Sequence, residues 1–208
     1  MSAILSALLA MLSTMSLSGH AMQPTETSTT AAEPAEIIEI DAAAYASADW
    51  PAYNRGIING TNVQGDPLAV KLGTETWLTK EVDLNARVLV LDFWAVWCGP
   101  CRAAEPKFHA LQKAHDGKLQ VLAISGQGET QSSVETYIGK KPDLNYSHLY
   151  DAKQSIYHSL KIRAIPHVLV LSTDGVVRWQ GNPHDPAFKK AVDQVVKNDP
   201  MIQAKFAG

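Results

Sequence analysis

Apolar residues in the middle of the chain alternate between strand-length runs and helical spacing. Residues 88–93 (VLVLDF) form an apolar, β-branched run that is typical of a strand buried on both faces. From 97 to 115 the apolar residues recur at helical spacing, and residues 119–124 repeat the strand pattern. The pattern therefore predicts a strand, a helix and a second strand, in that order.

Shorter segments continue this alternation. Residues 132–135 (SSVE) have the spacing of a capping box and predict a helix that runs to Ile138. Residues 146–150 suit a short strand. Asp151 can cap a following helix that carries Ile156 and Leu160 on one face.

The last third of the chain predicts a hairpin and a closing helix. Residues 167–171 and 176–180 are strand-like and are joined through residues 173–175 (TDG), where Asp-Gly is a strong turn signal. Residues 185–186 (DP) supply a capping carboxylate and a proline for the first turn of a helix. Its apolar face consists of Phe188, Val192, Val195 and Val196. The whole order predicts an α/β fold, a mixed β-sheet with helices on both faces.

The N-terminal part of the sequence lacks the regular alternation of strand and helix patterns. The apolar run 4–17, followed by the small residues Gly19 and Ala21, predicts a secretory signal over 1–21, although the first basic residue is Arg55. A buried N-terminal helix is the alternative. Residues 22–36 are polar and predict a linker, while 37–40 and 68–72 suit short strands. We expect a linker and extension over 22–66, a domain over 67–200 and a C-terminal tail over 201–208.

Composition narrows the possible functions. The chain has 208 residues and a net charge of −3, so no basic field is available to attract nucleic acid. No stretch reaches the roughly 18 to 20 apolar residues of a membrane-spanning helix. The 2 cysteines are too few for a disulfide scaffold. They are Cys98 and Cys101, and their spacing is the strongest functional signal in the chain.

The cysteine pair follows a predicted buried strand and opens a predicted helix. The unpaired N–H groups and the dipole at a helix N-terminus favour a thiolate, which is the nucleophile in disulfide exchange. We expect Cys98 to be exposed and to attack, and Cys101 to be buried and to resolve the mixed disulfide. The dipeptide Gly99-Pro100 between them influences the redox potential.

Roles outside redox chemistry suit the pair less well. A structural disulfide that closes so small a loop removes little chain entropy. A zinc site needs two more ligands, and the chain has no other cysteine to supply them. Two unrelated free thiols would not account for the strand before them and the helix after them.

Residues 93–101 (FWAVWCGPC) resemble the active-site segment of the thioredoxin superfamily. Asp92 matches a buried carboxyl beneath the cysteines of that family, and Ile165-Pro166 matches its cis-proline. The resemblance covers about residues 68–196 and implies a thioredoxin fold. An inserted segment over 126–149 between its two halves, the export signal and residues 171–175 resemble the periplasmic TlpA-like thiol–disulfide oxidoreductases.

Two positions depart from the pattern of those proteins. Many TlpA-like proteins have a glutamate three residues after the second cysteine, where this chain has Ala104 and then Glu105. His167 follows the proline, where threonine is commoner. A solvent-facing His167 could stabilise a thiolate or help to bind a metal, or it could be a surface residue without a role.

The resemblance and the chemistry of the residues assign roles. Burial should raise the pKa of Asp92, which then takes the proton of Cys101. Pro166 should lie over the sulfurs, the backbone of Ile165 should pair with an extended substrate, and Trp97 should form an apolar rim around Cys98.

The sequence thus predicts an exported, monomeric protein-disulfide reductase that needs no cofactor. Its expected partners are cysteine-containing protein substrates and a membrane electron donor that recharges it in the periplasm. The alternative function is a copper-binding chaperone that uses Cys98, Cys101 and His167 for Cu(I). A peroxidase is a weaker third hypothesis, because the sequence around the cysteines does not suit one.

Overall fold

The computed structural model describes residues 38–56, 59–72 and 74–207. The chain divides into two units, Met1–Glu36 and Ile37–Gly208, and only the second falls within the described residues. The predicted signal over 1–21 and most of the predicted linker therefore lie outside the described residues. Within the described part, no helix is long and apolar enough to cross a bilayer.

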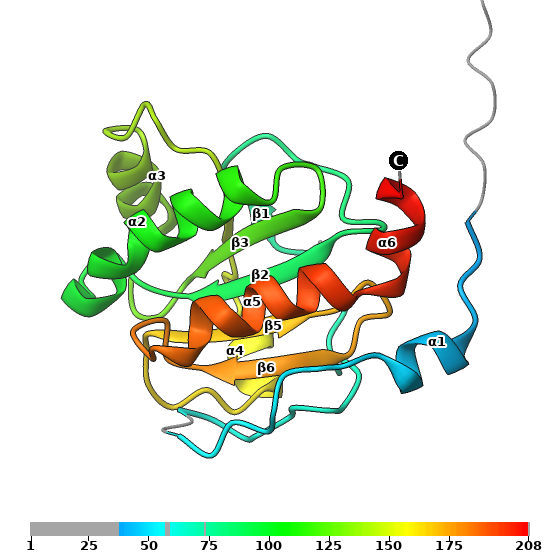
Figure 1. Cartoon of the computed structure of the whole chain (residues 1–208). Helices are drawn as coiled ribbons and strands as arrows, with labels where there is room; N and C mark the ends of the chain where they lie inside the picture. The colour runs from blue at the N-terminus through cyan, green and yellow to red at the C-terminus, as the bar shows by residue number, and fades with distance from the viewer. Residues whose placement is uncertain (1–37, 57–58, 73, 208) are drawn as a thin grey trace, which may run out of the picture. The chain divides into compact units, whose positions relative to one another are not determined.

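A six-stranded mixed sheet forms the centre of the second unit (Figure 1). Strand β2 runs parallel to β3, and β3 runs parallel to β4, while the other neighbouring pairs are antiparallel. The sheet confirms the predicted α/β class with a mixed sheet. In spatial order the strands are β1 (Thr76–Trp77), β4 (Ser147–Tyr150), β3 (Leu119–Ser125), β2 (Val88–Phe93), β5 (His167–Leu171) and β6 (Val177–Gly181).

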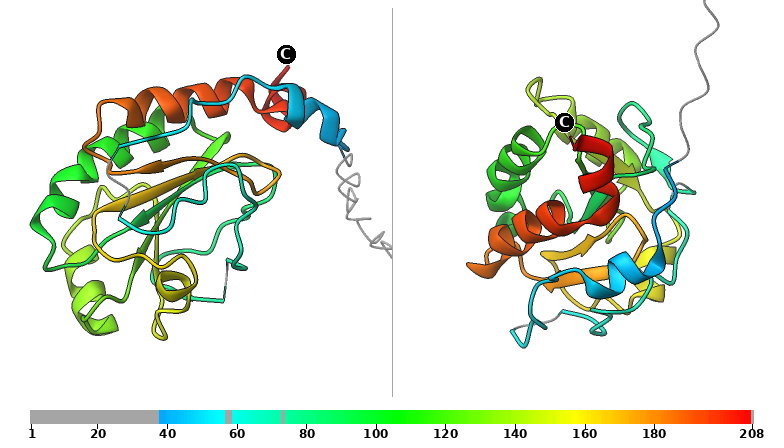
Figure 2. Two further views of the ribbon diagram at one scale, coloured as in Figure 1. Left: turned by 90° about the horizontal axis from the view of Figure 1, so that it is seen from below. Right: turned by 45° about the vertical axis from the view of Figure 1, so that its right-hand side comes forward.

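Helices cover both faces of this sheet (Figures 1 and 2). On one face, Phe108 of α2 contacts Phe188 of α5 at 5.9 Å between ring centroids. On the other face, Tyr157 of α4 contacts Phe93 of β2 at 5.2 Å. The core therefore has two apolar layers, one under α2 and α5 and one under α4. The helices are α1 (Ala42–Ser47), α2 (Gly99–Ala114), α3 (Gln131–Ile138), α4 (Ser155–Ser159), α5 (Ala187–Asn198) and α6 (Pro200–Phe206).

Strand β2 explains how the two layers are separated. Five of its six residues are buried and Leu89 is half-buried, as the apolar run predicted. Successive side chains of a strand point to opposite faces. Val88 and Val90 accordingly join the α2 layer, while Leu91 and Phe93 join the α4 layer.

The segment inserted between the two halves contains α3 and β4. The expected capping box at 132–135 is displaced, because α3 begins at Gln131 and the hydroxyl of Thr130 accepts the hydrogen bond from Ser133 N–H at 3.2 Å. The N-cap residue of α4 is Gln154, but the carboxyl of Asp151 performs the predicted capping from three residues further back. The Asp151 carboxylate accepts from the N–H groups of Ser155 and Ile156 at 2.9 and 2.8 Å.

The short strand predicted over 68–72 is wrong. Pro67 forms only an isolated bridge with Val176, and the residues after it follow an irregular path. The N-terminal extension nevertheless packs against β6. Asn54 donates to the carbonyl of Gln180 at 2.8 Å, and the Gln180 side chain accepts from Val63 N–H at 2.7 Å.

The chain end expected as a tail begins with helix α6. Asp199 caps this helix by accepting from Ile202 N–H at 3.1 Å, and its carboxylate also accepts from Thr173 N–H at 2.7 Å. Ile202 is buried. A buried cap and a buried apolar side chain attach residues 200–206 to the domain.

Candidate active site

Cys98 and Cys101 form a disulfide at the N-terminus of α2. Cys98 is the residue that caps the helix, and its sulfur accepts a hydrogen bond from Cys101 N–H at 3.2 Å. Gly99 and Pro100 occupy the first positions of the helix. A thiolate at Cys98 would receive the same N–H and the positive end of the helix dipole, both of which favour the charged form.

The disulfide is less accessible than the sequence suggests. Cys98 is only 4% exposed, so its predicted exposure is wrong for this disulfide form. The reason is the cap, because the sulfur turns toward the first turn of α2 and the apolar core. Trp97, at 60% exposure, is the most exposed large apolar side chain among the described residues, and its indole N–H donates to the carbonyl of Gln127 at 2.8 Å.

Asp92 lies near the end of β2 and is 3% exposed. Its Oδ1 has no hydrogen-bond partner among the described residues. Burial, with a smaller contribution from the charge of Glu105, raises the pKa of Asp92 well above its usual range. The direction agrees with the expectation for a carboxyl in an apolar strand.

Glu105 follows Ala104, the position where the resemblance led us to expect a glutamate. Its carboxylate accepts from the phenol of Tyr137 at 2.5 Å and pairs with the ammonium of Lys141. Both partners lie in the inserted segment around α3. Glu105 therefore links α2 to the insertion and also places negative charge near Asp92.

The peptide bond between Ile165 and Pro166 is cis, as the resemblance implied. Ile165 is partly buried and contacts both core layers. Asn59 of the N-terminal extension donates its side-chain amide to the Pro166 carbonyl at 3.3 Å, and its own carbonyl accepts from Arg163 N–H at 2.8 Å. The extension thus contacts the loop that contains the cis-proline.

His167 is not solvent-facing, and that expectation is wrong. It is 2% exposed and pairs in register with Phe93, whose side chain lies in the α4 layer. The two rings are 6.2 Å apart, and burial lowers the pKa of His167 to about 4. Cys98 and Cys101 belong to the opposite layer. The described residues contain no group of three or more His, Cys, Asp or Glu side chains arranged to hold a metal.

Glu129 is a residue of the site that the sequence pattern did not single out. Its two carboxylate oxygens accept from Val96 N–H at 2.6 Å and from Gly126 N–H at 3.1 Å. Tyr150 donates to the Glu129 carbonyl at 2.8 Å. The only sequence signal was a carboxylate that follows a glycine-rich loop after a buried strand, and this signal is weak.

The comparisons with known proteins agree with this geometry. Residues 85–177 match the family model described as thioredoxin-like. The chain is 32% identical over 76 residues to Thioredoxin 1 of Nostoc sp., an alignment that covers 36% of this chain and 70% of that protein. The chain belongs to the thioredoxin superfamily.

Other members of the superfamily are similar over a shorter part of their length. YneN of Bacillus subtilis, named a thioredoxin-like protein, is 29% identical over 46% of this chain and 56% of its own length. The thiol-disulfide oxidoreductase ResA of Oceanobacillus iheyensis is 28% identical over 46% of this chain and 49% of its own. The chain therefore spans only about half the length of these two relatives.

A solved structure supports the fold independently. The solution structure of a candidate protein disulfide isomerase from Bacteroides thetaiotaomicron superposes with a TM-score of 0.56. The alignment covers 69% of this chain and 94% of that protein, at 21% sequence identity. At this identity the likeness concerns the thioredoxin fold alone.

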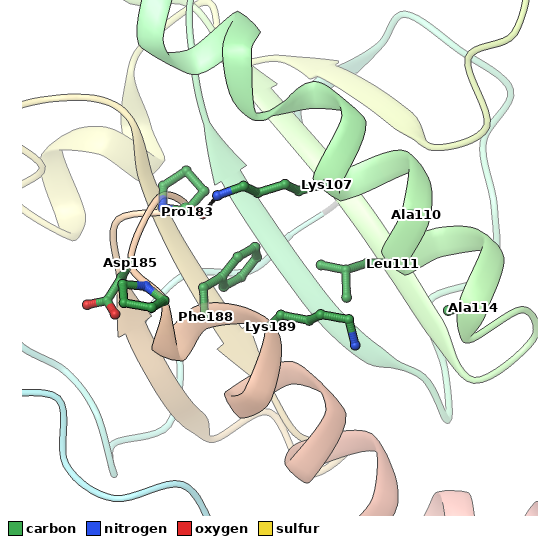
Figure 3. Close-up of a pocket in the computed structure, with 9 residues that line it drawn as sticks. Lys107, Ala110, Leu111, Ala114, Pro183, Asp185, Phe188 and Lys189 are labelled. Atoms are coloured by element: carbon green, nitrogen blue, oxygen red, sulfur yellow. Dashed lines mark hydrogen bonds between the residues drawn. The ribbon is translucent and has the colours of Figure 1, made fainter.

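The thioredoxin domain also has an apolar pocket of about 360 Å³ between α2 and α5 (Figure 3). Leu111 and Phe188 contribute to its walls. Lys107 lies at the pocket and donates to the Pro183 carbonyl at 2.9 Å. His184 follows Pro183 in the chain, and its Nε2 lies 2.8 Å from the carbonyl oxygen of Pro100. The loop that borders the pocket therefore also contacts the dipeptide between the cysteines.

Proposed function

We propose that this chain is a thiol–disulfide oxidoreductase of the cell envelope that reduces disulfides in other proteins. The observation that carries the proposal is the sulfur of Cys98 at the N-cap of α2, hydrogen-bonded to Cys101 N–H. Family membership supports the same chemistry. Two thiols that interconvert with one disulfide carry two electrons, so the cycle needs no cofactor.

The first step uses the reduced form of the protein. The Cys98 thiolate attacks one sulfur of a substrate disulfide, and the substrate S–S bond breaks as the Cys98–substrate bond forms. The departing substrate sulfur leaves as a thiolate and takes a proton from water. The helix terminus favours this step because it lowers the proton affinity of Cys98.

The second step releases the substrate. Asp92 accepts the proton of the Cys101 thiol, and the Cys101 thiolate attacks the Cys98 sulfur. The mixed disulfide breaks, and the second substrate sulfur leaves as a thiolate. The product is the Cys98–Cys101 disulfide, so two electrons have passed from the protein to the substrate. A raised pKa of Asp92 suits this role, because it brings the base closer to the proton affinity of a thiol.

Substrate binding is assigned to the surface around the disulfide. Trp97 supplies exposed apolar area, and Gly99 and Pro100 are also exposed. The backbone of Ile165, next to Pro166, pairs with an extended segment of a cysteine-containing protein. The protein acts as a monomer, and a membrane electron donor reduces its disulfide after each turnover.

An envelope location rests on the sequence of the N-terminus. The apolar run 4–17 and the small residues that follow it have the pattern of an export signal. Because the periplasm is kept oxidising, a reductase there would need a dedicated electron donor.

An insulin-reduction assay tests the proposal. The reduced protein should precipitate insulin in the presence of dithiothreitol, and Cys98→Ser should abolish this activity. Cys101→Ser should instead accumulate a mixed disulfide that is visible on a non-reducing gel. The wild type could instead lack thiol-dependent activity and bind one equivalent of Cu(I) that a mild chelator does not remove. That result would contradict the reductase and support the copper chaperone.

A further inference from the structure

Three buried side chains on the α2 face of the sheet have polar atoms without a hydrogen-bond partner among the described residues. These atoms are Oδ1 of Asp92, Nε1 of Trp94 and both ring nitrogens of His148. Each of the three side chains is at most 3% exposed. Buried polar groups are nearly always hydrogen-bonded, so four such atoms in one layer require a partner.

The register of the sheet places Asp92 and His148 in one row. Asp92 of β2 is opposite Ala123 of β3, and Ala123 is opposite His148 of β4. Neighbouring strands lie about 4.8 Å apart, so the two Cα atoms are separated by roughly 10 Å. The residue between them is Ala123, whose methyl side chain is much shorter than those of Asp92 and His148 on either side of it.

Aromatic rings enclose this row. Tyr146 stacks on His148 with ring centroids 5.0 Å apart, and Trp94 contacts His148 edge-on at 5.3 Å. Tyr146 also interacts with Asp92, because burial and then the charge of Asp92 raise the pKa of the phenol. Tyr146 therefore stacks on His148 and is also close enough to Asp92 for the charge of that carboxyl to act on its phenol.

We propose that His148 is a positioning residue for Asp92, hydrogen-bonded to the Asp92 carboxyl through a buried water above Ala123. A buried water needs two to four polar partners, and Asp92, His148 and Trp94 supply enough. The water gives the Asp92 carboxylate a donor and orients the carboxyl for the proton of Cys101. This inference rests on the proposed function, in which Asp92 accepts that proton.

His148 performs this role as a neutral imidazole. Tyr146 beside β4 stacks on His148, and the charges of Lys141 after α3 and His109 on α2 act on it. The charged or titratable groups that act on Tyr146 in turn are Asp92 on β2, Glu105 on α2 and Tyr137 on α3. Burial, with the positive charges of Lys141 and His109, lowers the pKa of His148 to about 3. A neutral imidazole has one N–H donor and one acceptor nitrogen, so it can hold a water without changing its own charge.

The test compares the titration of Asp92 in four proteins. The carboxyl carbon of Asp92 is followed by ¹³C NMR against pH in the wild type, His148→Phe, His148→Gln and a matched control, His115→Phe. His115 lies at the far end of α2 and bonds to Asp193. We expect His148→Phe to raise the Asp92 midpoint by about one pH unit, because the ionised carboxyl loses a donor. His148→Gln should restore at least half of the shift, and His115→Phe should leave the midpoint unchanged.

Kinetics provide the second readout. Stopped-flow measurement of mixed-disulfide resolution should show the same upward shift in its pH profile for His148→Phe, while the attack by Cys98 keeps the wild-type rate. In an Asp92→Asn background, His148→Phe should have no further effect on resolution. Identical Asp92 midpoints in the wild type and His148→Phe would overturn the proposal.

A variant with an intact histidine covers the case in which His148→Phe does not fold. Ala123→Val places a larger side chain between Asp92 and His148 while it keeps both polar side chains, so it should displace the proposed water and raise the Asp92 midpoint as well. An unchanged midpoint in that variant would contradict the proposal. The NMR titration needs no turnover, so a failure of the proposed reductase activity is seen separately, as a wild type without Cys98-dependent insulin reduction.

Discussion

Glu129 accepts a hydrogen bond from the backbone N–H of Val96 at 2.6 Å, two residues before the first cysteine. The other carboxylate oxygen accepts from Gly126 N–H at 3.1 Å. Gly126 has a φ of 130°, and a Cβ added there would lie 2.5 Å from the Asp151 carbonyl oxygen. The loop after β3 thus has a conformation that favours glycine, and its carboxylate fixes the loop that leads into Cys98.

Replacement of Glu129 should therefore loosen the active-site loop. Glu129→Ala removes acceptors for two N–H groups, and we expect a loss of about 1–3 kcal/mol in the free energy of unfolding. Glu129→Gln keeps one acceptor oxygen and should lose less. Urea unfolding measures both variants.

Glu135→Ala is the control for this experiment. The side chain of Glu135 accepts one hydrogen bond, from the side chain of Gln131 in the same helix α3. Glu135→Ala should change stability far less than Glu129→Ala. Equal stabilities of Glu129→Ala and the wild type would show that the carboxylate does not hold the loop.

The parts of the fold that the sequence predicted are those that depend on local pattern. Strand β2 was identifiable because nearly all its residues are apolar, and helix α5 because Phe188, Val192 and Val195 recur on one face. The position of Cys98 at a helix start was also local. Its burial was not, because that depends on how the cap turns the sulfur toward the core.

The error at His167 involves a relationship between distant segments. His167 was expected at the surface, but the pairing of β5 with β2 places it opposite Phe93 and in the α4 layer. The row from Asp92 across Ala123 to His148 requires the register of three strands. Periodicity within one segment cannot supply a register between two, so these relationships came only from the structure.

Two buried histidines should make the protein sensitive to mild acid. Burial lowers the pKa of His148 to about 3 and that of His167 to about 4, both below the ordinary 6.5. Between pH 6.5 and 4 the unfolded chain binds more protons at these groups than the folded chain. Each histidine should therefore cost about 1.4 kcal/mol of stability per pH unit as the pH falls through this range.

Asp92 and the half-buried Glu129 oppose this loss, since burial raises the pKa of both carboxyls and each therefore stabilises the protein on acidification. Two N–H donors to Glu129 limit the rise in its pKa, so we expect the two histidines to determine the sign of the change. The net expectation is a fall in the free energy of unfolding from pH 7 to pH 4.5, measured with urea. His148→Phe should make that fall smaller. His158→Phe, at an exposed position of α4, is the control for the loss of one imidazole. A wild type that is equally stable at both pH values would refute the assignment of two buried neutral histidines.

The reduction potential of the cysteine pair should be that of a reductant. Gly99 and Pro100 between the cysteines resemble the dipeptide of thioredoxin, whose potential is about −270 mV. We expect a similar value when the protein is equilibrated with dithiothreitol or glutathione buffers and followed by the fluorescence of Trp94 and Trp97. A potential near −120 mV, that of a strong periplasmic oxidant, would reverse the proposed direction of electron flow.

Asp92→Asn should both stabilise the protein and slow the resolution of the mixed disulfide. Because the pKa of Asp92 is raised, the folded state holds its proton more tightly than the unfolded chain, and the contribution of Asp92 to the stability of the wild type falls as the pH rises above about 4. The loss amounts to about 1.4 kcal/mol per pH unit and ends at the pKa of the folded state. Asparagine has no proton to lose, so the stability advantage of the variant should grow from pH 5 to pH 8.

The exposed Asp143→Asn is the matched control and should show no such growth. In the same preparations, Asp92→Asn should accumulate the mixed disulfide with substrate, because Cys101 has lost the base that takes its proton, while the first attack by Cys98 stays near the wild-type rate. Asp92→Asn could gain stability with rising pH and still resolve the mixed disulfide at the wild-type rate. That result would show that Asp92 is a buried acid with a raised pKa but is not the base in catalysis. A variant without the pH-dependent gain would mean that Asp92 titrates near its ordinary pKa in the folded protein.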